Sequence, residues 1–341
     1  MRTPAVAVLS ALALASAAAC APESAPEAPV PLSRSAPPAP PSAAVQEVLS
    51  QTRDQITRTA ASLRQVDDLP LYEMTYHGGY QAEAPLTEAE LARRGEGWAC
   101  SLFHRPGEFG RNFDWDPNPA MIVHNSPRDG YASVSVADVS YLFPPGARPD
   151  LDAPQDRRRL AHAVLTPFDG LNEKGLAVGL AQAPDARLPE PTPGRVTVSG
   201  VRIIRLMLDR AATVPEAIAL MRRYDLDFTG GPQLHYLIAD RAGRSAVVEY
   251  GQGRMNVIDD RYLTNITMTG AGRAAKLADA RYRRLAEGAG TEALELLRRV
   301  AQVHTRWSIV YDQDDLTARI VTARKWDRVH DVRLSAADGS G

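Results

Sequence analysis

The sequence predicts a layered α+β fold. Three observations support this prediction: strand-like segments come in runs, pairs of helical segments separate those runs, and Pro and Gly residues punctuate the runs as turns do. A parallel α/β fold would instead alternate one strand with one helix along the chain. The order of the segments therefore favours sheets and helices in separate layers.

The first structured segment is expected soon after residue 44. Apolar residues at helical spacing predict a helix over residues 45–66, and a short apolar run predicts a strand over residues 71–76. A capping-box pattern at its start predicts a further short helix over residues 87–95.

The rest of the chain is predicted to hold most of the strands. Short apolar segments bounded by turn residues predict strands over residues 101–103, 121–124, 131–136, 176–182, 235–240, 245–250, 255–259, 307–312 and 317–322. Apolar residues at helical spacing predict helices over residues 201–212, 213–224, 274–287 and 292–303.

Composition and charge limit the classes of function. The 341 residues carry a formal net charge of -2 and no basic block, so nothing in the sequence indicates nucleic-acid binding. Roughly 300 residues follow the N-terminal tracts, enough for one large domain or two small ones.

The N-terminus has the features of an export signal. Arg2 precedes an apolar stretch and then small residues, so residues 1–20 are expected to be a signal peptide that is too short to span a membrane. Cys20 stands where the lipid-bearing cysteine of a bacterial lipoprotein would stand, although Ala17 replaces the usual leucine. Two interpretations stay open: a lipidated Cys20, or cleavage near Ala19 with Cys20 as a bystander. Either interpretation predicts a periplasmic or cell-surface protein. Only a lipidated Cys20 would attach it to a membrane.

Residues 21–44 are mostly Ala, Pro, Ser and Glu and are expected to form a disordered linker. The chain has two cysteines. Because Cys20 lies at the signal boundary, it is a poor disulfide partner for Cys100, and a free thiol at Cys100 is expected. The simplest role for that thiol is a small buried hydrophobe.

A catalytic role for Cys100 would require a base. His104 and His124 are the nearest histidines, but neither lies in a recognised thiol-protease signature. A cut between Ala99 and Cys100 would instead give the cysteine its own α-amine, whose unperturbed pKa is roughly 7.7–8.0. Residues 45–99 would then be a propeptide or a small α-chain segment, and residues 100–341 the catalytic domain.

Residues 100–115, CSLFHRPGEFGRNFDW, resemble the mature N-terminus of a known family. This is the group of N-terminal-nucleophile (Ntn) hydrolases that includes choloylglycine hydrolase, penicillin V acylase and acid ceramidase. The segments FDGLNEKGL at 168–176 and LTN at 263–265 are also similar to family segments, and WSIVYD at 307–312 more weakly. The resemblance implies a four-layer αββα fold, self-cleavage before the cysteine, and hydrolysis of linear amide C–N bonds.

The resemblance also implies roles for five residues. Cys100 would be the nucleophile, with its new amine as the base. Asp114 would hold that amine, and Arg111 would lower the pKa of the thiol. Asn265 would donate to the oxyanion, and Arg281 matches a late arginine near the nucleophile.

Each of these residues also has a structural interpretation. Arg111 and Asp114 could form a structural ion pair, Asn265 could cap a turn, and Arg281 could lie on a solvated helix face. If residues 111–114 are extended, Arg111 and Asp114 face opposite sides, so a turn is expected to aim both at Cys100.

The chain departs from the family at one point. The family often has Asn or Tyr after the strand that ends at Gly179 and Leu180, but Ala181 and Gln182 stand here, which leaves the second oxyanion donor open. Asn172 is expected to be structural. No cofactor or metal is implied.

The favoured hypothesis is an exported, self-cleaving cysteine amidase that acts on a small-molecule N-acyl amide through a thioester at Cys100. Candidate substrates are N-acyl homoserine lactones, N-acyl amino acids, penicillin V-like amides and bile-salt conjugates. The alternatives are an acyltransferase that uses the same acyl-enzyme, a lipid-anchored non-catalytic protein, and a histidine-assisted thiol protease. The sequence predicts no oligomeric state.

Overall fold

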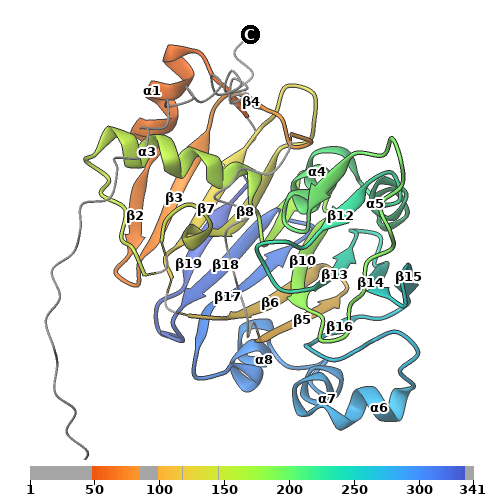
Figure 1. Ribbon diagram of the computed structural model, residues 1–341. Helices are drawn as coiled ribbons and strands as arrows, with labels where there is room; N and C mark the ends of the chain where they lie inside the picture. The colour runs from red at the N-terminus through yellow and green to blue at the C-terminus, as the bar shows by residue number, and fades with distance from the viewer. Residues whose placement is uncertain (1–47, 85–98, 117, 145, 335–341) are drawn as a thin grey trace, which may run out of the picture. The chain divides into compact units, whose positions relative to one another are not determined.

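Two β-sheets lie face to face at the centre of the structure (Figure 1). The computed structural model describes residues 48–84, 99–116, 118–144 and 146–334. The predicted signal peptide, Cys20, the linker over residues 21–44 and the short helix over residues 87–95 lie outside the described residues.

The larger sheet has nine strands in the order β15-β14-β13-β10-β9-β8-β7-β3-β2. All neighbouring strands in it are antiparallel except β3 and β7, which are parallel. Its strands are β2 (Arg64–Asp67), β3 (Leu71–Tyr76), β7 (Ala120–Asn125), β8 (Ser133–Asp138), β9 (Asp169–Asn172), β10 (Ala177–Gln182), β13 (Leu234–Ala239), β14 (Ser245–Gly251) and β15 (Arg254–Ile258).

The smaller sheet has six antiparallel strands in the order β16-β5-β6-β17-β18-β19. They are β5 (Ala99–Arg105), β6 (Glu108–Asp114), β16 (Tyr262–Leu263), β17 (Thr305–Asp312), β18 (Thr317–Thr322) and β19 (His330–Arg333). Two short pairs lie outside these sheets: β1 (Leu49–Ser50) with β4 (Gly79–Tyr80), and β11 (Thr197–Ser199) with β12 (Asp225–Asp227).

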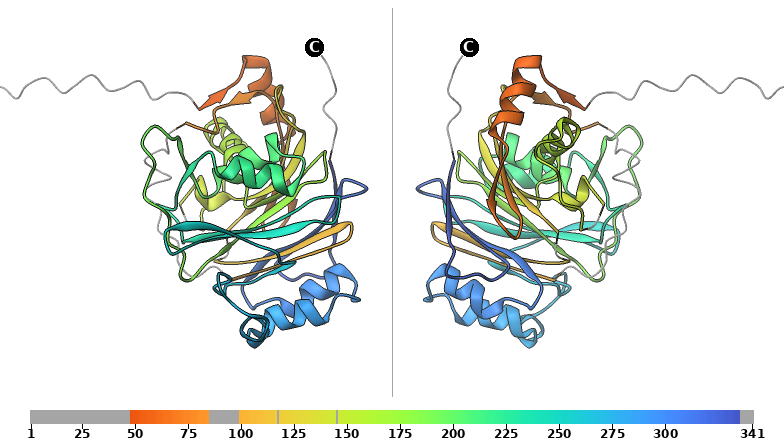
Figure 2. Two further views of the ribbon diagram at one scale, coloured as in Figure 1. Left: turned by 90° about the vertical axis from the view of Figure 1, so that its right-hand side faces the viewer. Right: turned by 90° about the vertical axis from the view of Figure 1, so that its left-hand side faces the viewer.

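Helices cover the outer face of each sheet (Figure 2). The helix α4 (Arg202–Arg210) packs on β9 and β10, and α5 (Val214–Met221) packs on β13 and β14. On the other side, α8 (Ala293–Val300) packs on β6 and β17, and α7 (Ala280–Glu287), which follows α6 (Arg273–Ala278), packs on β5 and β16. The other helices within the described residues are α1 (Arg53–Ser62), η1 (Val139–Tyr141), α3 (Pro154–Leu160) and η2 (Ala161–Leu165).

The two sheets are packed closely because a glycine lies between them. Strand β10 packs against β5, and a Cβ added to Gly179 would lie 2.6 Å from Cδ2 of Leu102. Both faces of β10 are therefore covered, which explains its continuous apolar sequence. The arrangement is the predicted four-layer αββα order.

Residues 48–84, part of the predicted propeptide, belong to the fold. Strand β3 pairs with β7 over six residues, and Leu71 and Met74 are fully buried. Beyond this strand, Tyr80 donates to Asp209 at 2.8 Å, and Arg202 donates to the Ala84 main-chain oxygen at 2.6 Å. The segment is therefore an integral part of the larger sheet.

Two predicted helices are wrong in extent. The helix predicted over residues 45–66 is only α1, because Thr52 caps it by accepting from the Gln55 N–H, and Leu63 is extended at its end. The flanking residues form β1 and β2 instead. The helix predicted over residues 274–287 is two helices, because Asp279 is extended, ends α6 and caps α7 through the Tyr282 N–H.

The other predicted strands and helices are present with ends shifted by a few residues. Strand β6 and the short strands β4, β9, β11, β12 and β19 were not predicted. Their residues owe their conformation to neighbouring strands rather than to a pattern of their own. Within the described residues, no helix is both long and apolar enough to span a membrane.

Candidate active site

The β5–β6 hairpin carries three of the five predicted catalytic residues, Cys100, Arg111 and Asp114, and also Ala99 of the predicted cleavage site. Cys100 pairs with Phe113, and Ala99 pairs with Asp114. Because residues directly opposite in a ladder share a face and successive residues alternate, Cys100 and Arg111 lie on one face of the hairpin and Asp114 lies on the other. The predicted turn between Arg111 and Asp114 is therefore wrong, since β6 runs straight through both.

The glycine of the GRNFDW motif lets the hairpin pack. Gly110 pairs with Phe103, and a Cβ at Gly110 would lie 2.2 Å from Cε1 of the Phe103 ring. A side chain at this position would displace the ring, so the motif needs a glycine here.

The Cys100 thiol is fully buried beside Arg111. Nη2 of Arg111 donates to the sulfur atom at 3.6 Å. Burial raises the pKa of the Cys100 thiol above its ordinary value, the Arg111 charge opposes this, and the Asp114 charge adds to it. Arg111 thus acts in the direction that the resemblance implies, but burial outweighs it while the Ala99–Cys100 bond is intact.

A buried carboxylate holds Arg111 in place. Nη1 of Arg111 lies 2.6 Å from Oδ2 of Asp169, and both side chains are fully buried. Asp169 also accepts hydrogen bonds from Trp307 Nε1 at 3.1 Å and from the Tyr311 hydroxyl. The guanidinium lies 4.8 Å from the centre of the Phe113 ring. Since Asp169, and not Asp114, pairs with Arg111, the alternative of an Arg111–Asp114 ion pair is wrong.

Asp114 lies on the opposite face of β6 and is also buried. Its Oδ1 accepts a hydrogen bond from the Thr305 hydroxyl, and its Oδ2 lies 3.9 Å from Nη1 of Arg281. Burial raises the pKa of Asp114 to about 7, although the Thr305 hydrogen bond and the Arg281 charge both act to lower it. Asp114 is therefore a carboxyl group that exchanges protons near neutral pH.

Arg281 and Asn265 meet the main chain of Cys100. Nη1 of Arg281 donates to the Cys100 carbonyl oxygen at 2.7 Å, and Nη2 donates to Asn265 Oδ1 at 3.1 Å. The same Asn265 oxygen accepts from the Cys100 N–H at 2.6 Å. The interpretation of Arg281 as part of a solvated helix face is wrong, whereas Arg283 and Arg284 beside it are exposed.

The Asn265 amide nitrogen donates to the Gln182 main-chain oxygen at 2.9 Å. In the uncut chain this nitrogen, which the resemblance assigns to the oxyanion, therefore contacts the end of β10. That strand end is also where the sequence departs from the family, so the two positions that the resemblance associates with the oxyanion lie next to each other in the structure.

The two histidines considered as bases do not contact Cys100. His104 lies four residues along β5, roughly 13 Å away at the usual rise of a strand, and burial lowers its pKa to about 4. His124 lies on β7 of the other sheet, where Nε2 is 2.9 Å from Oε1 of Glu73. The geometry therefore gives no support to a histidine-assisted thiol protease.

Asn172 uses its whole side chain within a turn. Its amide nitrogen donates to the Leu208 and Ala211 oxygens at 2.9 and 2.8 Å, and its oxygen accepts from the Lys174 and Leu176 N–H groups at 3.1 and 3.0 Å. No hydrogen-bonding capacity is left for a ligand.

Sequence reasoning missed Asp169, Thr305 and Tyr311. Asp169 stands in the segment that carries the resemblance, and its signal was an acidic residue within an apolar strand, which needs a buried cationic partner. Thr305 carries no comparable signal, because threonine is common in strands. Among the described residues, no group of three or more His, Cys, Asp or Glu side chains could hold a metal ion.

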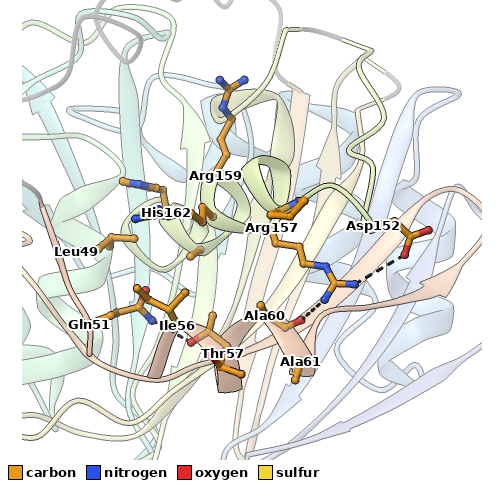
Figure 3. Close-up of a pocket in the computed structure, with 14 residues that line it drawn as sticks. Leu49, Gln51, Ile56, Thr57, Ala60, Ala61, Asp152, Arg157, Arg159 and His162 are labelled. Carbon is orange, nitrogen blue, oxygen red and sulfur yellow. Dashed lines mark hydrogen bonds and ion pairs between the residues drawn. The ribbon is translucent and has the colours of Figure 1, made fainter. Parts of the chain in front are cut away.

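A separate pocket of about 730 Å³ lies between α1 and α3 (Figure 3). Its arginines already have partners: Arg157 Nη1 donates to the Ala60 oxygen at 3.4 Å, and Arg159 lies 5.1 Å from the centre of the Phe143 ring. None of the five predicted catalytic residues lines this pocket. The Arg157 contact joins α3 to α1, and we assign the pocket no role.

The order of the layers identifies the fold. Two facing sheets between helical layers, with a cysteine at the start of an inner strand, form the Ntn-hydrolase fold. The predicted fold class is confirmed by solved structures. A mutant conjugated bile acid hydrolase from Clostridium perfringens aligns at 17% identity with a TM-score of 0.52, over 71% of this chain and 95% of that chain. Another variant of that hydrolase aligns at 16% identity with a TM-score of 0.50, over 72% and 95%.

Penicillin V acylase from Agrobacterium tumefaciens aligns at 18% identity over 71% of this chain and 80% of that chain, with a TM-score of 0.44. The family described as linear amide C-N hydrolases, choloylglycine hydrolase family, matches residues 160–268. This match confirms the predicted resemblance and the predicted enzyme class, hydrolases that act on linear amide C–N bonds. It includes Asp169 and Asn265, whereas Cys100, Arg111 and Asp114 lie before it. No curated protein matches the sequence.

Proposed function

We propose that the chain is an exported, self-cleaving cysteine amidase that hydrolyses a small-molecule N-acyl amide through a thioester at Cys100. One observation carries the proposal: each polar part of Cys100 has its own partner. Arg111 contacts the sulfur, Asn265 accepts from the main-chain nitrogen, and Arg281 donates to the carbonyl oxygen. Any buried residue needs partners for its main-chain groups, but a merely structural buried thiol does not need a buried arginine on its sulfur, nor side chains rather than a neighbouring strand on its main chain.

The first reaction would be cleavage of the chain. Sγ of Cys100 attacks the carbonyl carbon of Ala99, and the Ala99–Cys100 C–N bond breaks. The nitrogen takes the thiol proton and becomes the α-amine of Cys100, while Ala99 is held as a thioester. Water then hydrolyses the thioester, which gives the Ala99 carboxylate and the free thiol.

The second reaction would be amide hydrolysis by the new N-terminus. The Cys100 amine accepts the thiol proton, the thiolate attacks the substrate's acyl carbon, and the leaving amine takes that proton. Arg111 favours the thiolate, and Asn265 and Arg281 supply donors beside the reacting atoms. Water deacylates the thioester and releases the carboxylic acid; an acyltransferase would use an amine or alcohol at this step.

Two measurements test the proposal. Intact-mass analysis of the purified protein should show a fragment that begins at Cys100. The same protein is assayed against N-acyl homoserine lactones, N-acyl amino acids, penicillin V-like amides and bile-salt conjugates, with and without an added amine acceptor. Release of free acid without an acceptor supports the hydrolase, and acyl transfer that depends on the acceptor supports the acyltransferase. A fully active chain that still contains the Ala99–Cys100 bond would rule out self-cleavage as the activating step.

We also propose periplasmic or cell-surface export, which the signal pattern of residues 1–20 supports. Detergent partitioning of wild type and of Cys20→Ser tests the anchor, because several acyl chains bind a membrane firmly whereas one binds only marginally. A wild-type protein that stays in the aqueous phase without added lipid mass contradicts lipidation.

A further inference from the structure

Thr305 is buried beside Asp114. It is the first residue of β17, is only 1% exposed, and pairs directly with Asp114 in the ladder between β17 and β6. The register shifts just after it, between Thr305 and Trp307. Such irregularities re-aim side chains and are common beside active sites.

The single hydroxyl proton of Thr305 has a defined direction. Oγ1 accepts a hydrogen bond from the Gln302 N–H at 2.8 Å, and Oγ1 donates its own hydrogen to Oδ1 of Asp114. Because a hydroxyl has only one hydrogen, the Gln302 contact leaves that hydrogen to the carboxylate. Thr305 therefore links the start of β17 to one chosen oxygen of Asp114.

The other oxygen of Asp114 is left for the reaction. Oδ2 is buried and has no hydrogen-bond partner among the described residues. It lies 3.9 Å from Nη1 of Arg281, and the same nitrogen donates to the Cys100 carbonyl oxygen. The Thr305 hydrogen bond thus turns the free oxygen toward the Cys100 main chain.

We propose that Thr305 is a positioning residue. Its hydroxyl fixes the Asp114 side chain so that Oδ2 of Asp114 can interact with the main-chain nitrogen of Cys100 during cleavage and with the α-amine of Cys100 after cleavage. This inference rests on the proposed function and deepens it. Neither the sequence motif nor the family match points to this residue, since Thr305 lies outside residues 160–268.

The proposal predicts a change in pH dependence as well as in rate. The charged and titratable groups around Asp114 are Arg281 from α7, Arg306 from β17, Arg111 from β6 and the Cys100 thiol from β5. The Thr305 hydrogen bond lowers the pKa of Asp114 against the effect of burial. Its loss should therefore move the part of the rate profile that follows Asp114 ionisation to higher pH.

The test compares four proteins: wild type, Thr305→Val, Thr305→Ser and Thr322→Val. Thr322 is a matched control, because it is a buried threonine that donates to another buried carboxylate, Asp67, at 3.2 Å. Thr305→Val should slow chain cleavage and lower kcat by about 10- to 100-fold, the range for losing one hydrogen bond to a charged group. KM should change little, the profile should shift to higher pH, and Thr305→Ser should restore both rate and profile. Thr322→Val should leave rate and profile unchanged.

Each result decides between interpretations. If Thr305→Val matches wild type in rate and profile, the positioning role is wrong. If Thr305→Ser is as slow as Thr305→Val while both melt normally, Thr305 acts through packing alone, and the proposal is also wrong. If Thr305→Val does not fold, Thr305→Ala replaces it in the same comparison. If the wild type neither cleaves itself nor hydrolyses any amide, the proposed function is wrong. Equal activity of the wild type and the variant is a different result, because it contradicts only the positioning role.

Discussion

The residues on the two sides of the Ala99–Cys100 bond are held by different kinds of interaction. After the bond, β5 and β6 form a tight hairpin whose partners are close in sequence. Before it, residues 48–84 reach β7 of the other sheet through a parallel pairing, which cannot be made by a short turn. The first region is held by local pairing and contains Cys100, Arg111 and Asp114, three of the predicted catalytic residues. The second region is held by long-range pairing.

This difference indicates what a cut between the regions would change. The hairpin would keep its pairing from Cys100 onward, because only Ala99, the first residue of β5, lies before the bond. Residues 48–84 would keep contacts with both sheets, since β3 pairs with β7 and Asp67 lies 2.8 Å from His330 of β19. We therefore predict that the segment stays bound after cleavage as a small α-chain.

The largest effect is expected from deleting residues 48–84. Four buried side chains of β3 would be lost: Leu71, Tyr72, Met74 and Tyr76. At about 1.5–3 kcal/mol each, their burial is worth about 6–12 kcal/mol, as much as the whole stability of a typical domain. The deleted protein should be unfolded by circular dichroism, whereas deletion of residues 21–44 should leave the fold intact. A folded, active protein without residues 48–84 would show that the segment is dispensable.

In the region after the Ala99–Cys100 bond, the largest effect is expected from Cys100→Ala. The variant should remain a single uncut chain and lose amidase activity by at least about 10³-fold, because both the nucleophile and the new amine depend on this residue. Intact mass and turnover measure the two effects. Cys20→Ser is the matched control and should cut normally. Normal cutting of Cys100→Ala would contradict the proposed nucleophile.

Asp114→Asn should lower turnover by about 10²–10⁴-fold, the usual range for acid–base assistance. The protein must keep residues 48–84, since they form part of the sheet, so the variant is best studied after its own maturation or after co-refolding of the two segments. Normal melting with near-wild-type turnover would leave Asp114 without a catalytic role.

The raised pKa of Asp114 also predicts how stability depends on pH. Because the folded value is about 7 and the ordinary value is 3.8, the folded state binds more protons between these values. The contribution of Asp114 to stability therefore falls as pH rises from about 4 to 7. In a Cys100→Ala background, which stays uncut, Asp114→Asn should remove this decline in urea unfolding. An unchanged pH dependence would contradict the raised pKa.

The smallest expected effect concerns the contact of Glu73 in β3 with His124 in β7. Glu73→Gln should lower stability at pH 7 by about 0.2–1 kcal/mol, because the side chain is partly exposed. The hydrogen bond with His124 holds the pKa of Glu73 below its usual value, so this stabilisation is present above about pH 4.5 and is lost as pH falls through the folded pKa.

Glu108→Gln is the matched control for Glu73, because Glu108 pairs with Arg105 within the hairpin. In cut protein, urea should release residues 48–84 earlier from Glu73→Gln than from Glu108→Gln. Equal release from the two variants would show that the Glu73 contact does not hold the segment.

The sequence predicted the parts of the site that are close together along the chain. Cys100 and the GRNFDW motif are local, so their proximity follows from one hairpin. Asp169 and Thr305 could not be identified in this way, because each matters only through a residue that is distant in sequence. Asp169 contacts Arg111 of the other sheet, and Thr305 pairs with Asp114 on the neighbouring strand. A contact distant in sequence also contributes to one of the two helix errors, because the Thr264 hydroxyl donates to the side chain of Asp279, which separates α6 from α7.

The predicted geometry of the charged pair also shows a limit of pattern reasoning. The alternation of side chains along a strand places Arg111 and Asp114 on opposite faces. The sequence alone therefore suggested that only a turn could bring both side chains to Cys100. In the structure, one face presents the side chain of Cys100 and the other adjoins its main chain. Both charges can therefore act on one residue from a straight strand.

The parallel pairing of β3 with β7 has a consequence for the mature protein. Once the chain is cut, the two strands belong to separate polypeptides, and unfolding becomes a dissociation that obeys mass action. The melting temperature of cut protein should then rise with protein concentration, while that of uncut Cys100→Ala should not. A mature molecule that unfolds at high dilution must find its partner again by diffusion, so cleavage makes folding of this protein a largely one-way event.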